Sequence, residues 1–508
     1  MIPVVDIFAG PGGLAEGFSS LHHNDERFFS VRLSVEKEIE PFQTLRLRAF
    51  YRQFAPGRAP QEYYQFLRNE LSLQELHAAW PVQAEEAEQE TWQATLGMCD
   101  PEELDERIRE AISGERHWIL TGGPPCQAYS TAGIVGNRTK ANYSPETDER
   151  YLLYKEYIRV IAVHHPSVFV MENVPGLLFA KLAGQKIIES VLSGLRSPGD
   201  FAYKEFGLWP DAPQYRLFAL AHGVQGIDAP AENFLVHCEN YGVPQARSRI
   251  IILGFRDDID ISAFIPPPVV SATAVGKVLS SLPELRSTLS KEGDSLEKWR
   301  SVFREITPTT DWLVEAETLH GSELKQVILR AAAQLYQSSP ENSGENYLSC
   351  RAGTIWNRAW SADRSLKGVL HHEARPHIRP DLHRYLFCSC FRQVYGRSPK
   401  LPDFPISLLP KHKNALSGNF KDRFRVLSPD KPSHTVISHL AKDGHAFIHP
   451  DSLQCRSLTP REAARLQTFP DNYYFFGGRA SQFRQIGNAV PPWLAHLIAE
   501  SLVSIFTT

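Results

Sequence analysis

The sequence has 508 residues, of which 42% are hydrophobic, and its formal net charge is −4 at pH 7. A chain of this length buries a large core and is expected to hold two or more domains. Its seven cysteines lack paired spacing, and no signal peptide or long apolar run is visible. This composition argues against a disulfide scaffold or a membrane span and predicts a reducing, cytoplasmic setting.

The amino terminus combines a short apolar strand with a glycine-rich turn. Residues 4–8 form the strand, residues 9–14 the turn, and residues 14–21 a helix. Glycines let a ligand approach the backbone, and the start of a helix offers free N–H groups. A second strand, residues 31–35, ends in Glu36, an acid able to accept both hydroxyls of a ribose. Because no phosphate-binding Gly-Lys-Ser/Thr sequence is present, we expect a nucleoside-type cofactor without phosphates.

Two further buried strands each end in a reactive side chain. Residues 119–120 end a strand, and the stiff turn 122–125 then delivers Cys126. The apolar run 168–171 ends in Glu172 in the same way. Carboxyl ends of parallel strands share one edge of a sheet, where open α/β sheets place their ligands. We therefore expect a thiol and a carboxyl group side by side, although two unrelated strand ends would give the same pattern.

The carboxyl-terminal half carries a basic stretch between two apolar regions. A proline run at residues 264–268 predicts a stiff linker, and residues 270–430 follow it. Residues 351–431 hold 16 Lys/Arg against 6 Asp/Glu, together with histidines 371, 372, 377, 383 and 412. Such a local excess is typical of phosphate contacts, although a solvated charged face would look the same. A terminal helix over residues 492–506 is apolar at helical spacing and is expected to pack in the core.

Six segments together resemble motifs of the DNA (cytosine-5)-methyltransferase family of bacterial type, and they occur in the family's order. They are residues 6–13 (DIFAGPGG), 123–127 (GPPCQ), 172–174 (ENV), 241–249 (YGVPQARSR), 456–470 (RSLTPREAARLQTFP) and 485–492 (QIGNAVPP). The resemblance implies an α/β, Rossmann-like S-adenosylmethionine-dependent fold, with a mostly parallel seven-stranded sheet, helices on both faces and a smaller target-recognition domain. It places the catalytic domain at residues 1–265, target recognition at 270–430 and a return to the catalytic domain at 431–508.

The chemistry of cytosine C5 explains the residue types in these motifs. C5 is a poor nucleophile, so Cys126 would first attack C6 as a thiolate, its pKa lowered by Arg247 and Arg249. Glu172 in its protonated form would donate to N3 and accept from the exocyclic amine. The resemblance implies that Arg249 contacts O2, that Arg247 lies nearer the loop and the phosphate, and that Asn173 braces the site. The sequence does not identify the base that removes the C5 proton.

The resemblance also assigns cofactor and DNA contacts. S-adenosylmethionine is expected to contact Asp6, Phe8, Ala9, Gly10, Gly12, Gly13, Leu14, Glu36, Pro124, Asn488, Ala489 and Val490. Asp100 is the best candidate for an acid facing the adenine, although a surface turn fits it nearly as well. Gln127, Ser130 and Gln245 are expected to contact DNA. Residues 127–144 are interpreted as a loop that closes over a flipped base or, alternatively, as an ordinary surface loop.

Two features lie outside these motifs. Between Glu36 and Cys126 the chain is longer than compact members of the family require, which predicts a helical insertion at about residues 41–115. Its segments at 60–94 and 101–113 are rich in Glu, Gln and Ala, and this acidic character argues against a DNA contact. The pair Cys388 and Cys390 has no second pair to complete a metal site, so no metal is expected.

Three other functions remain open at this stage. An RNA cytosine-5 methyltransferase with the same fold is the nearest, but the basic region before residue 456 favours an enzyme that reads a DNA sequence. A non-catalytic DNA-binding relative would not need Cys126 and Glu172, and a nicotinamide-dependent oxidoreductase would not explain the Pro-Pro-Cys-Gln segment. The expected partner is double-stranded DNA near the bacterial nucleoid. Whether a cognate restriction endonuclease or another defence protein accompanies the chain stays open.

Overall fold

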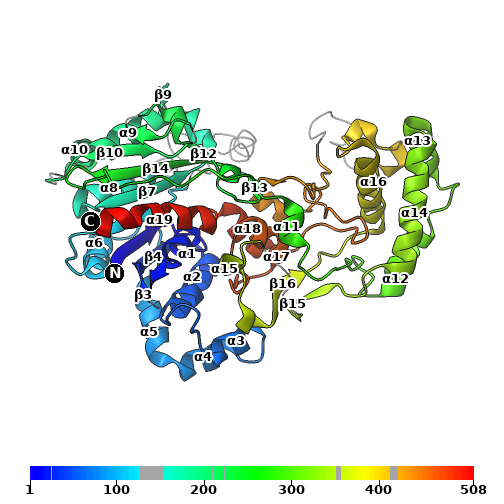
Figure 1. Cartoon of the computed structure of the whole chain (residues 1–508), viewed down its shortest axis with the longest axis horizontal. Helices are drawn as coiled ribbons and strands as arrows, with labels where there is room; N and C mark the ends of the chain where they lie inside the picture. The colour runs from blue at the N-terminus through cyan, green and yellow to red at the C-terminus, as the bar shows by residue number, and fades with distance from the viewer. Residues whose placement is uncertain are drawn as a thin grey trace.

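The protein has two lobes in the computed structural model, which describes residues 1–23, 26–125, 153–182, 184–208, 211–221, 223–227, 229–350, 356–411 and 422–507. The larger lobe contains both termini, and the smaller lobe is a group of helices at the far end of the long axis (Figure 1). A two-stranded sheet, β15 (Gly344–Ser349) and β16 (Gly368–Glu373), lies between them. We call this sheet the hinge sheet.

The larger lobe is built on one sheet, which has nine strands within the described residues. Its order is β11-β10-β14-β7-β6-β1-β4-β5, and β12 pairs with β14. The strands β5, β4, β1, β6 and β7 run parallel, whereas β14 and β10 are antiparallel additions. The bounds are β1 (Ile2–Ile7), β4 (Phe29–Glu36), β5 (Thr91–Gln93), β6 (Ile119–Gly122), β7 (Val168–Asn173), β10 (Tyr215–Ala219), β11 (Gly226–Ile227), β12 (Leu235–His237) and β14 (Ser248–Arg256). This arrangement confirms the expected fold class, and the short strands β11 and β12 account for the two strands beyond the expected seven.

Helices cover both faces of the sheet because the parallel strands alternate their buried side chains between two cores. One core joins Val5 and Ile7 to α6 (Pro101–Ile112), α8 (Leu153–His164) and α9 (Ile187–Arg196). The other joins Val4 to α1 (Gly13–Ser19) and to α19 (Pro492–Thr507). The stretch Arg479–Thr507 is apolar and long enough to cross a membrane, but 56% of its most apolar window is buried, as in a core helix.

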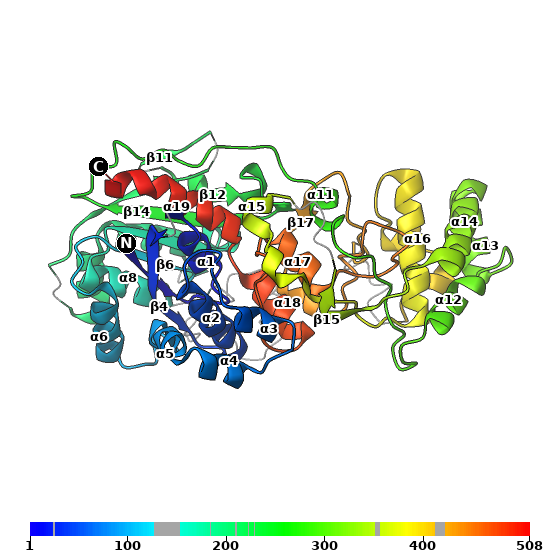
Figure 2. The same ribbon diagram turned by 60° about the horizontal axis from the view of Figure 1, so that its bottom comes forward.

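The helical insertion is shorter than the sequence suggested. Helix α6 is part of the central fold, because Leu104 and Ile108 pack in the core of the sheet. The additional helices are α3 (Gln61–Leu67), α4 (Leu73–Ala79) and α5 (Pro81–Glu90), which follow α2 (Ile39–Arg52). In both views α3 lies next to the hinge sheet (Figures 1 and 2). We call α3 to α5 the brace.

The smaller lobe has its own hydrophobic core. Its helices are α12 (Leu296–Arg304), α13 (Asp311–His320), α14 (Ser322–Ser338) and α16 (Arg379–Tyr395). The core also takes Ile448 and Cys455 from the chain beyond residue 430. Conversely, α11 (Val275–Leu279) packs with α17 (Pro460–Leu466) and α18 (Arg479–Asn488), away from the lobe core. The hydrophobic core of this lobe is therefore built from segments that precede and follow the hinge sheet in the sequence. We call it the recognition lobe after its predicted role.

Candidate active site at the carboxyl edge of the sheet

The residues expected to act together follow four strands that end in register. Ile7 pairs with Val35 on one side and with Gly122 on the other, and Gly122 pairs with Met171. The next residues along these strands, Phe8, Glu36, Gly123 and Glu172, therefore share one edge of the sheet. The predicted nucleophile Cys126 and the expected DNA contacts Gln127 and Ser130 lie outside the described residues.

Glu172 is a buried acid with a cationic partner. Burial raises the pKa of its carboxyl group, although the positive charge of Arg249 acts in the opposite direction. The Arg249 Nε atom lies 2.7 Å from the Glu172 Oε1 atom, and both side chains are only 11% exposed. A Cβ atom added to Gly123 would lie 2.9 Å from Glu172 Oε2. Glycine at position 123 thus leaves room for the carboxyl group beside the turn that leads to Cys126.

Asn173 connects the two catalytic segments. Its side-chain amide donates to the carbonyl of Pro124 at 3.3 Å, and its Oδ1 accepts from the amide of Val174 at 2.9 Å. The end of β7 and the Pro-Pro turn are held together by this buried side chain. Asn173 therefore links the end of β7 to the turn before Cys126, and its expected role in bracing the site stays a prediction.

Arg247 differs from its expected position near a DNA phosphate. Its guanidinium is fully buried and donates to the carbonyls of Val436, Gly487 and Ala489, each at 2.9 Å. Burial and the neighbouring Arg249 lower its pKa to about 9. Its Nη1 and Nη2 atoms donate inside the protein, and its Nε atom is buried without a hydrogen-bond partner among the described residues. The expected contact with the loop and phosphate is therefore wrong, and the residue ties the start of β14 to the end of α18.

Gln245 also faces the interior, so the expected DNA contact is wrong. Its side-chain amide donates to Gln467 Oε1 at 2.6 Å, and its Oε1 accepts from the amide of Val436 at 2.6 Å. It lies in the two-residue strand β13 (Gln245–Ala246), which pairs with β17 (Ser433–His434). This pairing with a distant segment turns the side chain inward and leaves no polar group free for a base.

The glycine turn and Glu36 form the candidate cofactor site. The amide of Gly10 donates to Glu36 Oε2 at 2.9 Å, and the amide of Glu38 donates to Oε1 at 2.8 Å. Burial raises the pKa of Glu36 despite these bonds. Gly10 has a φ of +58°, and nothing lies within 4 Å of where its Cβ would be, so a ligand can approach the backbone there. Phe8 also has a positive φ of 57°, which turns the chain sharply at the end of β1.

The other end of the chain closes the same turn. A Cβ atom on Gly13 would lie 2.3 Å from the carbonyl oxygen of Val490, so only glycine allows this contact. Leu14 and Ala489 are buried, whereas Asn488 is exposed at the end of α18. The Tyr473 hydroxyl donates to the carbonyl of Pro11. The first and last motifs are therefore one structural unit. Within the first motif, the amide of Ala9 donates to the carbonyl of Val35.

Asp6 lies beneath the turn and is fully buried. It accepts from the Thr121 hydroxyl at 2.8 Å, and burial raises its pKa to about 6 even though this hydrogen bond acts to lower it. Its Oδ2 atom has no hydrogen-bond partner among the described residues. An uncompensated buried acceptor below Gly10 and beside α1 fits a donor-bearing ligand at this site. Together with Glu36, it makes the site suitable for the nucleoside and amino-acid groups of S-adenosylmethionine.

Asp100 does not fit the expected adenine contact. It is exposed and caps α6, with Oδ1 accepting from the amide of Glu102 at 3.0 Å. The carboxylate thus stabilises the first turn of its own helix. The alternative interpretation of this residue, a surface turn, is the one that the structure supports.

Part of the basic stretch is neutralised within the protein. Five of its arginines pair with carboxylates: Arg379 with Glu292, Arg384 with Asp381, Arg397 with Asp403, Arg423 with Asp443 and Arg425 with Asp422. Burial lowers the pKa of histidines 371, 372, 377 and 383, which keeps them neutral at pH 7. Exposed cations without an ion-pair partner in the described part of the stretch include Arg358, Arg364, Lys367, Lys411 and Lys431. The net excess therefore overstates the charge available to DNA.

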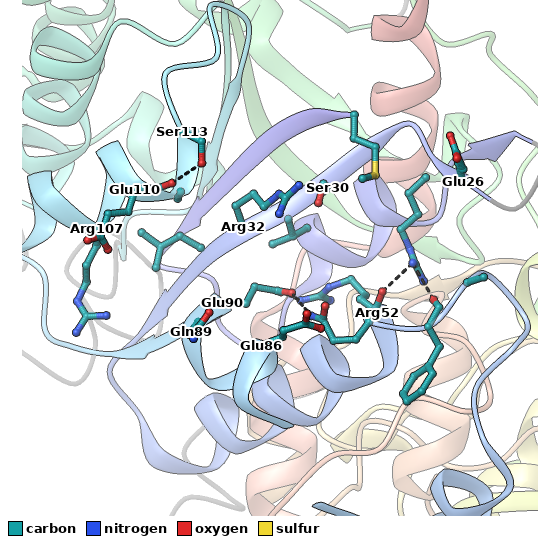
Figure 3. A pocket seen from close by; sticks show the side chains of 18 residues that line it. Glu26, Ser30, Arg32, Arg52, Glu86, Gln89, Glu90, Arg107, Glu110 and Ser113 are labelled. Carbon is teal, nitrogen blue, oxygen red and sulfur yellow. Dashed lines mark hydrogen bonds and ion pairs between the residues drawn. The ribbon is translucent and has the colours of Figure 1, made fainter. Parts of the chain in front are cut away.

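A pocket of about 840 Å³ opens at the opposite edge of the sheet (Figure 3). Met1 and Ser30 place it at the amino ends of β1 and β4. It is lined by four arginines (Arg27, Arg32, Arg52 and Arg107) and four glutamates (Glu26, Glu86, Glu90 and Glu110). This balance selects neither an anion nor a cation, and the pocket contains no residue of the six motifs. Within the described residues, no group of three or more His, Cys, Asp or Glu side chains is arranged to hold a metal ion.

Sequence reasoning missed the buried partners of these motifs. Glu16 pairs with Arg48, Arg456 pairs with Glu462, and Tyr473 contacts the glycine turn. The capping sequence of α17, in which Thr459 and Glu462 bond reciprocally, was a visible signal for Glu462. Nothing local in the sequence indicates the partners of Glu16 or Tyr473, because they are joined only by the fold.

Comparisons with known proteins identify the family of this chain. Residues 68–504 match the family model described as C-5 cytosine-specific DNA methylase. The type II methyltransferase M.Bpa9945I of Bacillus paralicheniformis is 30% identical over 99% of this chain and 98% of its own length. The DNA (cytosine-5-)-methyltransferase M.ApeKI of Aeropyrum pernix is 27% identical over 84% of this chain and 88% of its own length.

A solved structure shares the fold. It is described as a DNA modification methyltransferase encoded within an E. coli prophage, with a TM-score of 0.52, 19% identity and 100% coverage of both chains. At this identity the likeness concerns the fold alone. With its family model spanning most of the sequence, this chain is a member of the C-5 cytosine-specific DNA methylase family.

Proposed function

We propose that this protein transfers the methyl group of S-adenosylmethionine to C5 of a cytosine in a specific duplex DNA sequence, through a covalent bond between Cys126 and C6. The observation that carries the proposal is Glu172, a buried acid of raised pKa at the strand edge beside the turn that leads to Cys126. Such an acid holds a proton near neutral pH more readily than an exposed glutamate, and it can donate that proton to cytosine N3.

The covalent step follows from the residues at this edge. The Cys126 thiolate adds to C6 while Glu172 stabilises charge at N3, and electron density moves to C5. When bound, S-adenosylmethionine supplies an electrophilic methyl group to that carbon. Loss of the C5 proton to a base then breaks the bond between sulfur and C6 and restores the thiolate and the aromatic ring. Arg249, already adjacent to Glu172, is the candidate for O2 of the base.

The substrate base must leave the duplex for this chemistry. The reacting atoms C5 and C6 are approached from above and below the ring, and stacked neighbours block both faces. We infer base flipping from this requirement. Exposed cations of the recognition lobe would hold the DNA backbone, while side chains of the same lobe read base edges.

The cofactor assignment is supported by the open space at Gly10 and by the two buried acids. Glu36 would accept hydrogen bonds from the ribose, and the free amides at the start of α1 would bind the carboxylate of the methionine part. Type II methyltransferases among the relatives support a role as the modification enzyme of a restriction–modification pair inside a bacterial cell. An RNA methyltransferase of the same fold is the second candidate.

Trapping distinguishes these possibilities. Duplex DNA with 5-fluorocytosine in a site found by bisulfite sequencing should form a stable adduct with the wild-type protein, because fluorine at C5 cannot leave as a proton does. Cys126→Ala should abolish the adduct, whereas the control Cys99→Ala should retain it. An adduct with Cys126→Ala would show that Cys126 is not the nucleophile. Methylation of RNA but not of DNA would favour the second candidate.

A further inference from the structure

A buried polar chain begins at the helix that follows the glycine turn. Glu16 on α1 accepts two bonds from Arg48 on α2, at 2.7 Å from Nε and 2.5 Å from Nη2. Both side chains are only 6% exposed, and the Glu16 carboxylate raises the pKa of Arg48 against the effect of burial. The remaining Nη1 of Arg48 donates to Asn472 Oδ1 at 3.1 Å. Helix α1, which follows the glycine turn, is thereby fixed to the segment that follows α17.

The chain continues to the hinge sheet and the brace. Asn472 donates from Nδ2 to Asp363 Oδ2 at 2.7 Å, and the Tyr64 hydroxyl donates to the same oxygen at 2.8 Å. Asp363 caps the short helix η6 (Arg364–Leu366), which leads directly into β16. One carboxylate oxygen thus joins the catalytic domain, the brace and the connection to the recognition lobe.

The same segment also touches the glycine turn directly. Tyr473, next to Asn472, donates its hydroxyl to the carbonyl of Pro11, and a Cβ atom on Gly12 would lie 3.0 Å from this hydroxyl. Arg48 stacks over the ring of Tyr51, 3.9 Å from its centroid. Hydrogen bonds of Tyr473 and Asn472, which are adjacent in sequence, therefore connect the glycine turn with Asp363.

Apolar packing alone would hold the brace in place. Phe66 and Leu67 share a core with Leu366 and Leu370 of the hinge segment. The rings of Phe66 and Tyr474 are 5.4 Å apart. Buried ionic and polar groups add little net stability to such a core, because each group must first be desolvated. Their hydrogen bonds are directional, however, and they select one arrangement of the three segments.

We propose that Tyr64, Asp363 and Asn472 are positioning residues that couple cofactor binding at the glycine turn to the orientation of the recognition lobe on DNA. The inference rests on the proposed function, since it requires both ligands. It assigns a role to the brace, which contributes Tyr64 and no residue of the six motifs. By linkage, DNA strengthens cofactor binding by the same factor as the cofactor strengthens DNA binding.

Calorimetry with S-adenosylhomocysteine measures this coupling. For the wild type, we expect its dissociation constant to fall at least about 5-fold when a duplex carrying the mapped site is present, within the usual range of coupling between sites. Tyr64→Phe should reduce this gain below about 2-fold while leaving the dissociation constant without DNA unchanged. Its KM for DNA should rise while kcat stays close to the wild-type value.

The matched control is Tyr215→Phe. This variant also loses a buried hydrogen bond, which the Tyr215 hydroxyl donates to the carbonyl of Pro166 at 2.8 Å, but at the opposite edge of the sheet. The control should keep the full coupling. Asp363→Ala, at a half-buried position, should behave as Tyr64→Phe does and decides the matter if Tyr64→Phe fails to fold.

Three results would overturn the inference: no coupling in a wild-type protein that methylates DNA, full coupling in the folded variants, or an equal loss of coupling in Tyr215→Phe. Absence of DNA methylation by the wild type, read by bisulfite sequencing, would instead overturn the proposed function.

Discussion

Glu172 and Arg249 form a diagonal pair across two antiparallel strands. Glu172 lies opposite Ile251 and Asn173 opposite Ile250, so Arg249 stands one step beyond the end of β7. Side chains two residues apart on a strand share a face, which places Arg249 on the same face as Ile251 and above Glu172. The ion pair at 2.7 Å therefore holds the acid in a fixed direction at the edge of the sheet.

Glu172→Gln should lower turnover by about 10²-fold or more, in the range of acid–base contributions. The amide keeps the shape of the side chain but cannot hold and return the same proton. Steady-state methylation of the mapped duplex measures the effect, and cofactor affinity and Tm should stay close to wild type. Near-wild-type turnover would contradict the proposed role.

Arg249→Met should alter the pH profile as well as the rate. The positive charge of Arg249 lowers the pKa of Glu172, so its removal raises that pKa further. If the protonated acid is the active form, activity is lost as pH rises through this pKa, and the alkaline limb should move to higher pH in the variant. A limb that moves to lower pH, or does not move, would argue against Glu172 as the proton donor.

Glu36→Ala should weaken cofactor binding by about 1.5–3 kcal/mol, the usual value of hydrogen bonds to a charged group. Calorimetry with S-adenosylhomocysteine gives the dissociation constant. Glu38→Ala is the matched control, because the side chain of Glu38 is 63% exposed and pairs with Lys37 at 3.5 Å. Equal affinities for the Glu36 variant and the wild type would remove Glu36 from the site.

Arg247→Met should destabilise the fold by about 2 kcal/mol or more, because the buried carbonyls of Val436 and Gly487 lose a donor and each unsatisfied group costs about 1–3 kcal/mol. The carbonyl of Ala489 keeps the Gln467 side chain as a donor. Urea unfolding measures the change. Arg32→Met offers a comparison at an exposed arginine on β4 with no ion-pair partner in the described residues. A stable Arg247→Met protein that has lost only DNA affinity would restore the phosphate contact that the sequence suggested.

Exchange of residues 270–430 with those of a related enzyme should transfer the methylated sequence, as read by bisulfite mapping, because base edges are read by side chains outside the shared motifs. Lys411→Gln and Lys431→Gln should each flatten the salt dependence of binding by about one unit if they contact phosphates. Lys204→Gln, on the exposed surface of α10 (Pro198–Phe206), should leave the slope unchanged. If the chimera still methylates the DNA sequence of the recipient enzyme, sequence recognition lies outside residues 270–430.

Strand ends were predictable from the sequence because buried parallel strands appear as short apolar runs and end at turn residues. The sharing of one edge by Glu36 and Glu172 follows from this pattern. Helix α19 was predictable for the same reason, since its apolar spacing is local. The fold class was implied by the resemblance to the family, and these local patterns agree with it.

The environments of Gln245, Arg247 and Asp100 were not predictable from motif position. Gln245 and Arg247 are buried because β13 pairs with a strand far along the chain, and such pairing leaves no local trace. Asp100 precedes a proline at the first position of α6, and this capping signal explains why it does not face the adenine. The charge count of the basic stretch misled because Glu292 and Asp443, which lie outside residues 351–431, pair with Arg379 and Arg423.

The contact between Gly13 and the carbonyl of Val490 has a consequence for biosynthesis. The glycine turn leaves the ribosome first, yet α1 gains its covering helix only when α19 has been translated. A nascent or prematurely terminated chain thus leaves Leu14, Ala15 and Phe18 uncovered. Chaperones and proteases bind exposed apolar surface of this kind, so a chain acquires methylation activity only once α19 has been synthesised.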